Sequence, residues 1–259
     1  MNITDYFNTH FEIVPADTND LLEEVLKLRY QVFCVETTIL NKRKHSNCRE
    51  RDQYDNRSAH RLIRHKETGL YVASVRLVLH DPDDPKNLFP IEKFCSNFFY
   101  KGDVLTKNLP RESLCEVSRF LISKERQKEI SNANALKGEN HRTKIVFRRK
   151  DGLLCYLVLF GLISSVIHTA LEKNRPNWYV CVEPSLFRLL KQFGIVFTPI
   201  GPSFDYNGQR LPCFGTTESV LNGIHQYRPD LWKFVTQGTP TIPIKYSQEL
   251  EARLGIKHI

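Results

Sequence analysis

The sequence predicts a mixed α/β sheet in one continuous domain. Apolar residues alternate in some stretches, as in strands, and recur every three or four positions in others, as in helices. These two kinds of stretch are interleaved along the 259 residues, and no proline- or glycine-rich linker separates them. Apolar residues make up 41% of the chain and charged residues 25%, which is typical of a globular protein with a substantial core.

The first part of the chain predicts a strand, a helix and a hairpin. The strand covers residues 11–16, and the helix covers 17–33, where it opens with capping residues and continues with apolar residues at helical spacing. Residues 37–57 are charged and have no clear period, so we expect a loop or an irregular lid. Residues 58–80 form two β-like runs around the turn sequence "KETG", which predicts a hairpin.

The second part of the chain completes the sheet and its helices. The predicted elements are a short helix (91–95), a strand (113–123), a long apolar helix (153–171), a strand (177–183), a helix (184–194), two closing strands (195–201 and 209–217) and a terminal helix interrupted at Pro229 (219–235). Residues 123–145 are polar and weakly patterned, which predicts a mobile insertion. We expect the domain to cover residues 1–237, followed by an extension over 238–259.

Charge and cysteine content narrow the class of protein. The net charge is +8, from 37 basic and 29 acidic residues, and it favours an anionic partner such as nucleic acid, a membrane face or an acidic protein. The seven cysteines are odd in number and scattered, without a CxxC pair, which is typical of reduced thiols in a cytoplasmic protein. The N-terminal sequence does not resemble a signal peptide. The apolar segment 153–171 is barely long enough to span a membrane, so a buried helix is the preferred interpretation.

Two carboxylates lie three positions apart in the loop before the hairpin. Asp52 and Asp55 could hold the ammonium group of an amine substrate, or they could pair with Arg51, Arg57 or Arg29. A solvated charged loop is the simpler interpretation of this motif taken alone.

Charged residues also interrupt two apolar strands. Arg76 lies within "YVASVRLVLH", and Glu116 and Arg119 lie within "CEVSRFLIS". A charge in a core strand is costly unless it is paired or faces a cleft, so a structural ion-pair network and a functional site are both open. Strict alternation places Glu116 and Arg119 on opposite faces, and a bulge between them would be needed for a shared face.

A basic stretch precedes the long apolar helix. Arg148, Arg149 and Lys150 are followed by Gly152 in the predicted turn, where a phosphate end of a cofactor could bind or where the loop could simply be basic. The nine histidines are scattered without metal-ligand spacing, so no metal site is expected. No GxSxG motif or nucleophile triad is found.

Four segments resemble a known family when they are taken together. "LRYQVF", "RDQYDN", "VRLV" and "CEVSRFLIS" occur in the order and at roughly the spacing of acyl-homoserine-lactone (autoinducer) synthases, which have a GNAT-type fold. A second resemblance rests on "FEIVPADTNDLLEEVLKLRYQVFCVE", "EPSLFRLLKQFGI", "GQRLPCF" and "YRPDLWKFVTQG". These segments look like those of the acyltransferases associated with PEP-CTERM/exosortase systems, and the likeness covers nearly the whole chain, to about residue 238. Those proteins are akin to long-chain N-acyl amino acid synthases. The resemblance implies a GNAT-like three-layer fold with a central mixed, splayed sheet and helices on both faces.

The resemblance also implies roles for particular residues. Glu116 would be the catalytic base. The acceptor side of the site would be lined by Arg29, Phe33, Asp52, Asp55, Arg76 and Arg119. The strand 116–122 would splay from its neighbour and bind the pantetheine arm of the donor through its backbone. Residues assigned to the acyl donor are Ser118, Phe120, Leu121, Ile122, Arg148, Arg149 and Gly152.

Two departures from the family pattern bear on substrate and donor. Autoinducer synthases usually carry tryptophan shortly after the first helix, whereas this chain has Thr37, Thr38 and Ile39, which argues against a homoserine-lactone product. The pyrophosphate loop of ordinary GNAT enzymes is replaced by "RRKDG", which favours an acyl carrier protein over acetyl coenzyme A. Carrier proteins are acidic, and the net charge of +8 suits one.

We therefore expect an N-acyltransferase that moves a long fatty acyl group from an acyl thioester, on acyl carrier protein or coenzyme A, to a small amine such as an amino acid. A lipid product would also allow peripheral association with a membrane. Two alternatives stay open: an acyl-homoserine-lactone synthase that uses S-adenosylmethionine, and a non-catalytic GNAT-like binding module. Nucleic-acid binding is not expected, because the basic stretch 123–150 contains acidic residues and almost no aromatic ones.

Overall fold

The described part of the chain divides into two compact units. The structure is a computed structural model that describes residues 2–45, 47–84, 88–95, 99–100, 109–136 and 150–236. The first unit combines Met1–Leu77 with Ser118–Val166, and the second combines Val78–Val117 with Ile167–Ile259. Each unit is therefore built from two separate stretches of the chain.

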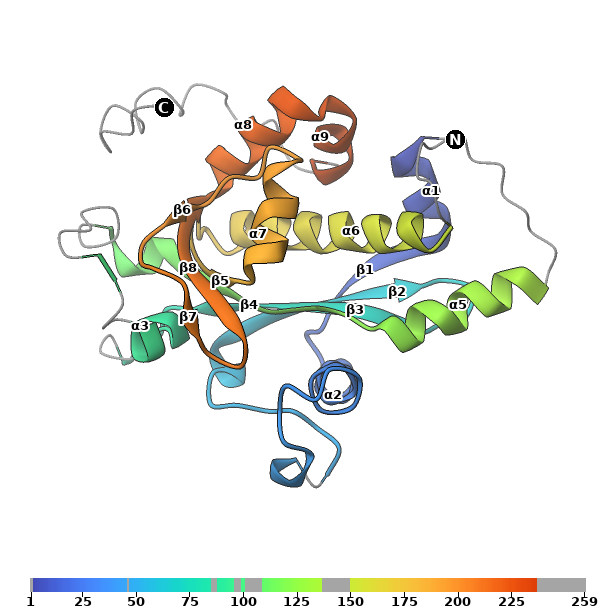
Figure 1. Cartoon of the computed structure of the whole chain (residues 1–259), viewed down its shortest axis with the longest axis horizontal. Helices are drawn as coiled ribbons and strands as arrows, with labels where there is room; N and C mark the ends of the chain where they lie inside the picture. Colours follow the sequence, from blue (N-terminus) through green and yellow to red (C-terminus); the bar gives the residue numbers. More distant parts are fainter. Residues whose placement is uncertain are drawn as a thin grey trace. The chain divides into compact units, whose positions relative to one another are not determined.

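The first unit contains strands with helices on both sides. Its elements are α1 (Ile3–His10), β1 (Phe11–Pro15), α2 (Asn19–Tyr30), the π-helix η1 (Gln31–Glu36), the 3-10 helices η2 (Lys42–Lys44) and η3 (Asp55–Arg57), β2 (Ser58–His65), most of β3 (Tyr71–Leu79), the end of β4 (Leu114–Ile122), α5 (Lys124–Leu136) and most of α6 (Lys150–Glu172). The strand order is β1-β2-β3-β4, and β1 pairs with β2 in antiparallel register from Phe11 opposite His65 to Pro15 opposite Arg61. Figure 1 shows α2 on one side of these strands and α1 and α6 on the other.

The core of the first unit explains why α2 forms where the apolar spacing predicts it. Val25, Leu28 and Val32 are buried against Leu62 of β2 and Leu121 of β4. The helix begins at a capping threonine, whose side chain accepts a hydrogen bond from the backbone three residues later. Burial of these apolar side chains removes them from water, which is the main driving force for docking the helix on the sheet.

Several local features of the first unit differ from the sequence-based predictions. Helix α1 was not predicted; it is short and begins at Ile3, and the side chain of the preceding Asn2 caps it. The predicted helix over 17–33 is α-helical only to Tyr30 and then becomes the π-helix η1, in which Thr37 N–H donates to the carbonyl of Val32. The first part of the expected insertion 123–145 is the helix α5. Its remainder, from residue 137, lies outside the described residues, as does the extension 238–259.

The second unit holds the remaining strands of the mixed sheet. Its elements are α3 (Pro90–Cys95), the 3-10 helix η5 (Arg111–Ser113), the start of β4, β5 (Asn177–Val182), α7 (Pro184–Lys191), β6 (Thr198–Pro199), β7 (Phe204–Asp205), β8 (Gln209–Thr216), α8 (Thr217–Tyr227) and α9 (Pro229–Val235). The strand order is β4-β5-β8-β6, with β7 also paired to β8. Strands β4 and β5 are parallel, whereas β5 and β8 are antiparallel.

The parallel pairing of β4 with β5 is short. It joins Leu114–Val117 to Asn177–Val180, although β4 runs to Ile122 and β5 to Val182. The family resemblance assigns the pantetheine arm to residues 116–122, and of these only Glu116 and Val117 lie in the paired register with β5.

Helix α6 is the apolar segment that could be taken for a membrane span. Among the described residues, one stretch, Leu154–Glu172, is long and apolar enough to cross a membrane. Most of it is buried inside the protein, as expected for the core helix predicted from sequence. The helix starts at Lys150, so Gly152 lies within its first turn and not in the turn before it.

Candidate active site

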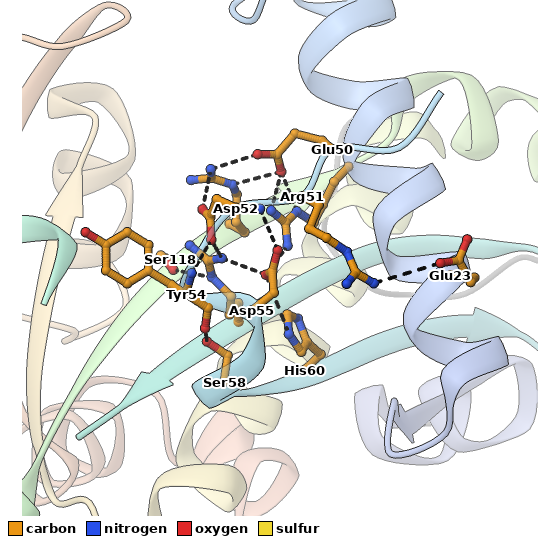
Figure 2. Close-up of polar contacts among 12 residues, drawn as sticks. Glu23, Glu50, Arg51, Asp52, Tyr54, Asp55, Ser58, His60 and Ser118 are labelled. Carbon is orange, nitrogen blue, oxygen red and sulfur yellow. Dashed lines mark hydrogen bonds and ion pairs between the residues drawn. The ribbon is translucent and has the colours of Figure 1, made fainter. Parts of the chain in front are cut away.

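The D-x-x-D motif closes its own turn. The carboxylate of Asp55 accepts a hydrogen bond from the backbone N–H of Asp52 at 2.8 Å, and the carboxylate of Asp52 accepts one from the backbone N–H of Tyr54 at 2.9 Å. These bonds replace hydrogen bonds that a loop would otherwise make to water. The turn fixes both carboxylates in front of strands β2 and β3, and Figure 2 shows them close together with Glu50.

Arg29 is a fully buried cation at the end of α2. Its Nη1 donates to Asp55 Oδ1 at 2.6 Å, and its Nε donates to Glu50 Oε2. The side chain of Arg29 has no exposed surface, and those of Glu50 and Asp55 are 2% and 1% exposed. Arg29 therefore holds the carboxylates of Glu50 and Asp55 in place from the protein interior and does not face solvent.

Arg76 joins the same carboxylates from the middle of β3. Its Nη1 lies 2.6 Å from Asp52 Oδ1 and 2.7 Å from Asp55 Oδ1. Its Nε donates to Ser118 Oγ of β4 at 3.0 Å. The charge that interrupts the apolar strand is thus paired, as expected for a buried arginine.

Arg119 of β4 forms the outer part of the cluster. It binds Glu50 through two hydrogen bonds, from Nε to Oε2 at 3.0 Å and from Nη2 to Oε1 at 2.8 Å. Nη2 also lies 2.9 Å from Asp52 Oδ2, and the guanidinium lies 5.7 Å from the ring centroid of Phe33. The backbone of Arg119 is left-handed, with a φ of 49°, which interrupts the regular alternation of the strand at this residue.

The six ionised side chains form a closed and electrically balanced set, which we call the ion cluster. Its members are Arg29, Arg76, Arg119, Glu50, Asp52 and Asp55. Three positive charges meet three negative charges, so the cluster is neutral as a whole. Only one ion pair has both partners open to solvent: the side chain of Arg119 is 27% exposed and that of Asp52 is 23% exposed.

The paired charges shift the protonation equilibria of the carboxyl groups. Burial alone would raise the pKa of Glu50, but the hydrogen bonds and charges of Arg119 and Arg29 lower it. The pKa of Asp55 is also held well below its ordinary value, because Arg29 and Arg76 outweigh the effect of burial. All three carboxyl groups, including Asp52 with its partners, are therefore ionised at neutral pH.

His60 lies beneath the cluster on β2. Its Nε2 is 3.7 Å from Asp55 Oδ1, which is beyond hydrogen-bonding distance. Burial lowers the pKa of His60 to about 4, and the nearby charges of Arg29 and Arg76 add to this effect. The imidazole is therefore neutral at pH 7, which keeps the total charge of the site balanced.

The structure separates the predicted site residues by their access to solvent. Arg119 and Asp52 are partly open, Phe33 is half-buried beside them in η1, and Arg29, Asp55 and Arg76 are buried below. The carboxylates do not pair with Arg51, which instead lies 3.9 Å from Glu23 and points away from the ion cluster in Figure 2.

The predicted donor-binding residues fall into two groups. In β4, Ser118, Phe120 and Ile122 are half-buried, whereas the side chain of Leu121 is in the core of the first unit. Leu121 could therefore serve a ligand only through its backbone. Arg148 and Arg149 lie outside the described residues, and the surroundings of Gly152 are not described either.

Glu116 belongs to the second unit, where it contacts the start of α3. Its side chain is buried, with the residue 3% exposed, and Oε2 accepts a hydrogen bond from the backbone N–H of Ile91 at 2.8 Å. The first N–H groups of a helix lack partners within the helix, so a carboxylate there stabilises the helix start. This contact gives Glu116 a structural role whatever its part in chemistry.

Two members of the site were not identified from the sequence. Glu50 holds both Arg29 and Arg119, and His60 fills the space beneath Asp55. Glu50 could have been inferred from charge balance. The three arginines of the site need three carboxylate partners, and Asp52 and Asp55 supply only two. No local signal singles out His60, because its strand also contains Arg61, Arg64 and His65.

The comparison with protein families bears on this part of the chain. Residues 28–134 match the family described as acetyltransferase (GNAT) domain. This stretch contains every member of the ion cluster. Residues 28–134 are a GNAT-type acyltransferase domain.

Solved structures of other proteins share the fold of this chain. TofI in a ternary complex with an inhibitor and MTA has a TM-score of 0.55 and 14% identity, over 86% of this chain and 99% of that chain. BjaI with MTA, a CoA-dependent acyl-homoserine lactone synthase, has a TM-score of 0.52 and 18% identity, over 84% and 88%. FeeM, an N-acyl amino acid synthase from uncultured soil microbes, has a TM-score of 0.50 and 10% identity, over 82% and 93%.

These likenesses confirm the GNAT-like α/β fold predicted from the sequence. A search among curated proteins finds no match to the chain. In the part of the chain that the structure describes, no group of three histidine, cysteine, aspartate or glutamate side chains is placed to hold a metal ion.

Proposed function

We propose that this GNAT protein transfers a fatty acyl group from an acyl thioester to the amino group of an amino acid. The observation that carries the proposal is the half-exposed ion pair of Arg119 and Asp52 above a buried, neutral set of charges. An amino acid has both charges needed to replace that pair, one ammonium and one carboxylate. It can therefore bind without leaving a charge of the site unpaired.

Arg119 and Asp52 each have hydrogen-bonding capacity that an amino acid could use when it replaces their ion pair. Arg119 uses Nε and Nη2 for Glu50 and Asp52, and no acceptor among the described residues lies on its Nη1. The N–H groups of Arg119 Nη1 are therefore suited to bind the carboxylate of an amino acid. Asp52 Oδ2 accepts from Arg119 alone among the described residues, so it is the oxygen best placed to receive the ammonium. Phe33 would provide the apolar wall beside them.

The chemical step follows from the reacting groups. The bound ammonium must lose a proton, after which the amine attacks the thioester carbonyl. A C–N bond forms, the C–S bond breaks, and the thiol leaves with one proton, so no oxidant or covalent enzyme intermediate is needed. We propose Glu116 as the base, directly or through water, on the strength of the E-x-S-R-F motif that it shares with autoinducer synthases.

The donor end is proposed from the same motif. The backbone of Ser118–Ile122 would bind the pantetheine arm, and its N–H groups would stabilise the oxyanion of the tetrahedral intermediate. The donor would be an acyl group on carrier protein or coenzyme A. Each methylene of the acyl chain that is buried would add roughly 0.8 kcal/mol, so pocket depth would set the preferred chain length.

The test is product analysis with purified protein. The protein is incubated with a mixture of the common amino acids and a long-chain acyl donor, either acyl-coenzyme A or acyl carrier protein, and the products are identified by mass spectrometry. We expect N-acyl amino acids, and the product masses would identify the acceptor. Acyl lactones formed only with S-adenosylmethionine, or no product with any acceptor and donor, would contradict the proposal.

Variants separate acceptor binding from loss of fold. Asp52→Asn removes the charge but keeps an oxygen for the Tyr54 N–H, and we expect a roughly 10- to 100-fold loss of kcat/KM for the amino acid. Glu23→Gln is the control, because it weakens a half-exposed pair with Arg49 outside the cluster. Equal activity of the Asp52→Asn variant and the wild type would refute the role of Asp52.

The base requires its own variant. Glu116→Gln keeps an oxygen that can accept from Ile91 N–H, so the start of α3 should remain intact while proton removal fails. We expect turnover to fall at least about 100-fold with unchanged thermal unfolding. Retained turnover would leave Glu116 with its structural role alone.

A further inference from the structure

A strongly basic segment lies in the sequence between Arg29 and Asp52 of the ion cluster. Residues 41–51 read "NKRKHSNCRER" and contain five lysine and arginine residues and one acid, Glu50, which is buried. We call the exposed turn η2 (Lys42–Lys44), with all three of its cationic side chains, the basic turn. It carries a local charge of +3 on consecutive residues.

The cations of the basic turn are not neutralised by nearby acids. At the end of the segment, Arg49 and Arg51 share Glu23 of α2. Lys42, Arg43 and Lys44, in contrast, form no ion pair with any of the described residues. The Asn41 side chain accepts a hydrogen bond from Arg43 N–H at 2.9 Å, which caps the turn and holds it in shape.

The segment that carries the turn is anchored to the site at both ends. Leu40 N–H donates to the carbonyl of Phe33 at 3.0 Å, and Glu50 N–H donates to the carbonyl of Leu26 at 3.1 Å. Phe33 contacts the Arg119 guanidinium and Glu50 binds it, so a partner held at the turn would sit on the segment that frames the acceptor site. In Figure 1 the basic turn lies on the side of α2 that faces away from the strands of the first unit.

We infer that the basic turn is the docking surface for an acidic acyl carrier protein that delivers the acyl chain. The inference rests on the proposed function and identifies where the donor protein binds. Side chains of a 3-10 helix project about 120° apart, so three consecutive ones cover an area and cannot converge on one phosphate. Such a spread of cations suits the scattered carboxylates of an acidic protein surface better than the compact phosphates of a nucleotide.

The test measures binding directly, apart from turnover. A fluorescently labelled acyl carrier protein is titrated with the wild type, with Arg43→Glu/Lys44→Glu, and with Arg188→Glu/Lys191→Glu, a control that reverses one exposed arginine and one exposed lysine on α7. At about 50 mM salt we expect the first variant to bind at least about tenfold more weakly and the control to stay within about twofold. The wild-type affinity should fall with added salt, and that fall should be shallower in the first variant.

Turnover distinguishes the carrier protein from other anions. The first variant should keep its kcat/KM with acyl-coenzyme A, because neither residue contacts the site, while its kcat/KM with acyl carrier protein falls by a similar factor to binding. An equal loss with both donors would assign the turn to the nucleotide of coenzyme A and overturn the inference. Equal weakening in both variants, or no binding of carrier protein by the wild type, would also overturn it. Absence of acyl transfer from either donor would overturn the proposed function, and the titration would still decide the docking surface.

Discussion

Arg119 combines a strained backbone with the most open charge of the site. A non-glycine residue with a φ of 49° carries a conformational cost of roughly 1–3 kcal/mol, which the surrounding contacts must offset. The two hydrogen bonds that Arg119 donates to the Glu50 carboxylate hold the guanidinium in a fixed plane. Glu50 therefore acts on Arg119 both as a counter-charge and as a geometric restraint.

Removal of that counter-charge should destabilise the protein. Glu50→Gln leaves the cluster with three arginines and two carboxylates, and two of these arginines, Arg29 and Arg76, are buried. We expect the free energy of unfolding to fall by about 3–5 kcal/mol, measured by urea denaturation at pH 7. Glu23→Gln, which affects a half-exposed pair, should cost about 0–1 kcal/mol. Similar losses in the two variants would show that the cluster is not the buried unit described above.

His60 predicts how stability depends on pH between 7 and 5. Its pKa is lowered to about 4 in the folded protein, against about 6.5 when unfolded. Protonation therefore favours the unfolded state, and stability is lost as pH falls below 6.5 until the folded pKa is reached. This single group should remove about 2 kcal/mol between pH 7 and pH 5.

The variant His60→Gln tests this expectation, since it cannot take up a proton. Its loss of unfolding free energy between pH 7 and pH 5, measured in urea, should be about 2 kcal/mol smaller than that of the wild type. The carboxyl groups of the cluster do not interfere. Their lowered pKa values stabilise the fold above about pH 4, and that contribution is lost only at lower pH. Parallel pH profiles of the two proteins would contradict the assignment.

At the level of single residues, sequence reasoning identified charges that need partners but not the partners themselves. Arg76 and Arg119 interrupt apolar strands, so their pairing was predictable from the cost of burial alone. Glu50 pairs with the cluster arginines, whereas Glu23 pairs with Arg49 and Arg51 outside the cluster. This difference arises because the loop folds back so that Glu50 N–H binds the carbonyl of Leu26, and no local sequence pattern encodes that fold. The left-handed backbone of Arg119 could not be predicted either, because arginine gives no signal for that conformation.

Among the elements, the π-helix η1 is coupled to α5. Glu36 at the end of η1 accepts hydrogen bonds from Ser123 Oγ at 2.5 Å and from Lys124 N–H at 2.8 Å, and Gln31 binds Glu125. A carboxylate at the first free N–H groups stabilises the start of a helix. The same element that presents Phe33 to the site therefore also holds α5 in place.

Loss of this contact should loosen α5 locally. In Glu36→Ala we expect faster hydrogen–deuterium exchange at the amides of α5, by about tenfold, because the cap contributes roughly 1–2 kcal/mol. Exchange in β2 and β3 should not change. Glu24→Ala is the control, since Glu24 is exposed and pairs only with Lys27 on the same helix. Unchanged exchange in α5 would show that its stability comes from elsewhere.

The predictable elements were those with a strong apolar period. The hairpin of β2 and β3, helix α6 and the break at Pro229 between α8 and α9 follow from alternation, length and the missing N–H of proline. Helix α5 gave no such signal, because its sequence is polar and it buries little beyond Ile130. Helix α1 was missed because a short helix depends on its cap and on docking of Phe7 rather than on periodicity.

For the whole molecule, the distribution of cysteines predicts its thiol reactivity. All seven are free; Cys48 and Cys155 are exposed, and the others are buried or half-buried. Burial also raises the pKa of Cys34 and brings that of Cys213 to about 12, which suppresses the reactive thiolate. We expect two thiols to react rapidly with an aromatic disulfide reagent in the native protein and seven in denaturant. More than two fast thiols, or fewer than seven in denaturant, would contradict the arrangement.

The chain passes from one unit to the other three times, and each of these boundaries falls inside a helix or a strand. The boundaries lie after Leu77 in β3, after Val117 in β4 and after Val166 in α6. Neither unit is encoded by one continuous stretch of sequence, so neither can be transferred into a relative as a single segment. A chimera that exchanged one unit would need three crossovers, each within a hydrogen-bonded strand or helix. Recombination between relatives should therefore be tolerated best in the loops within a unit. Under the proposed function, new substrate preferences should arise by point substitution around Arg119 rather than by exchange of a whole unit.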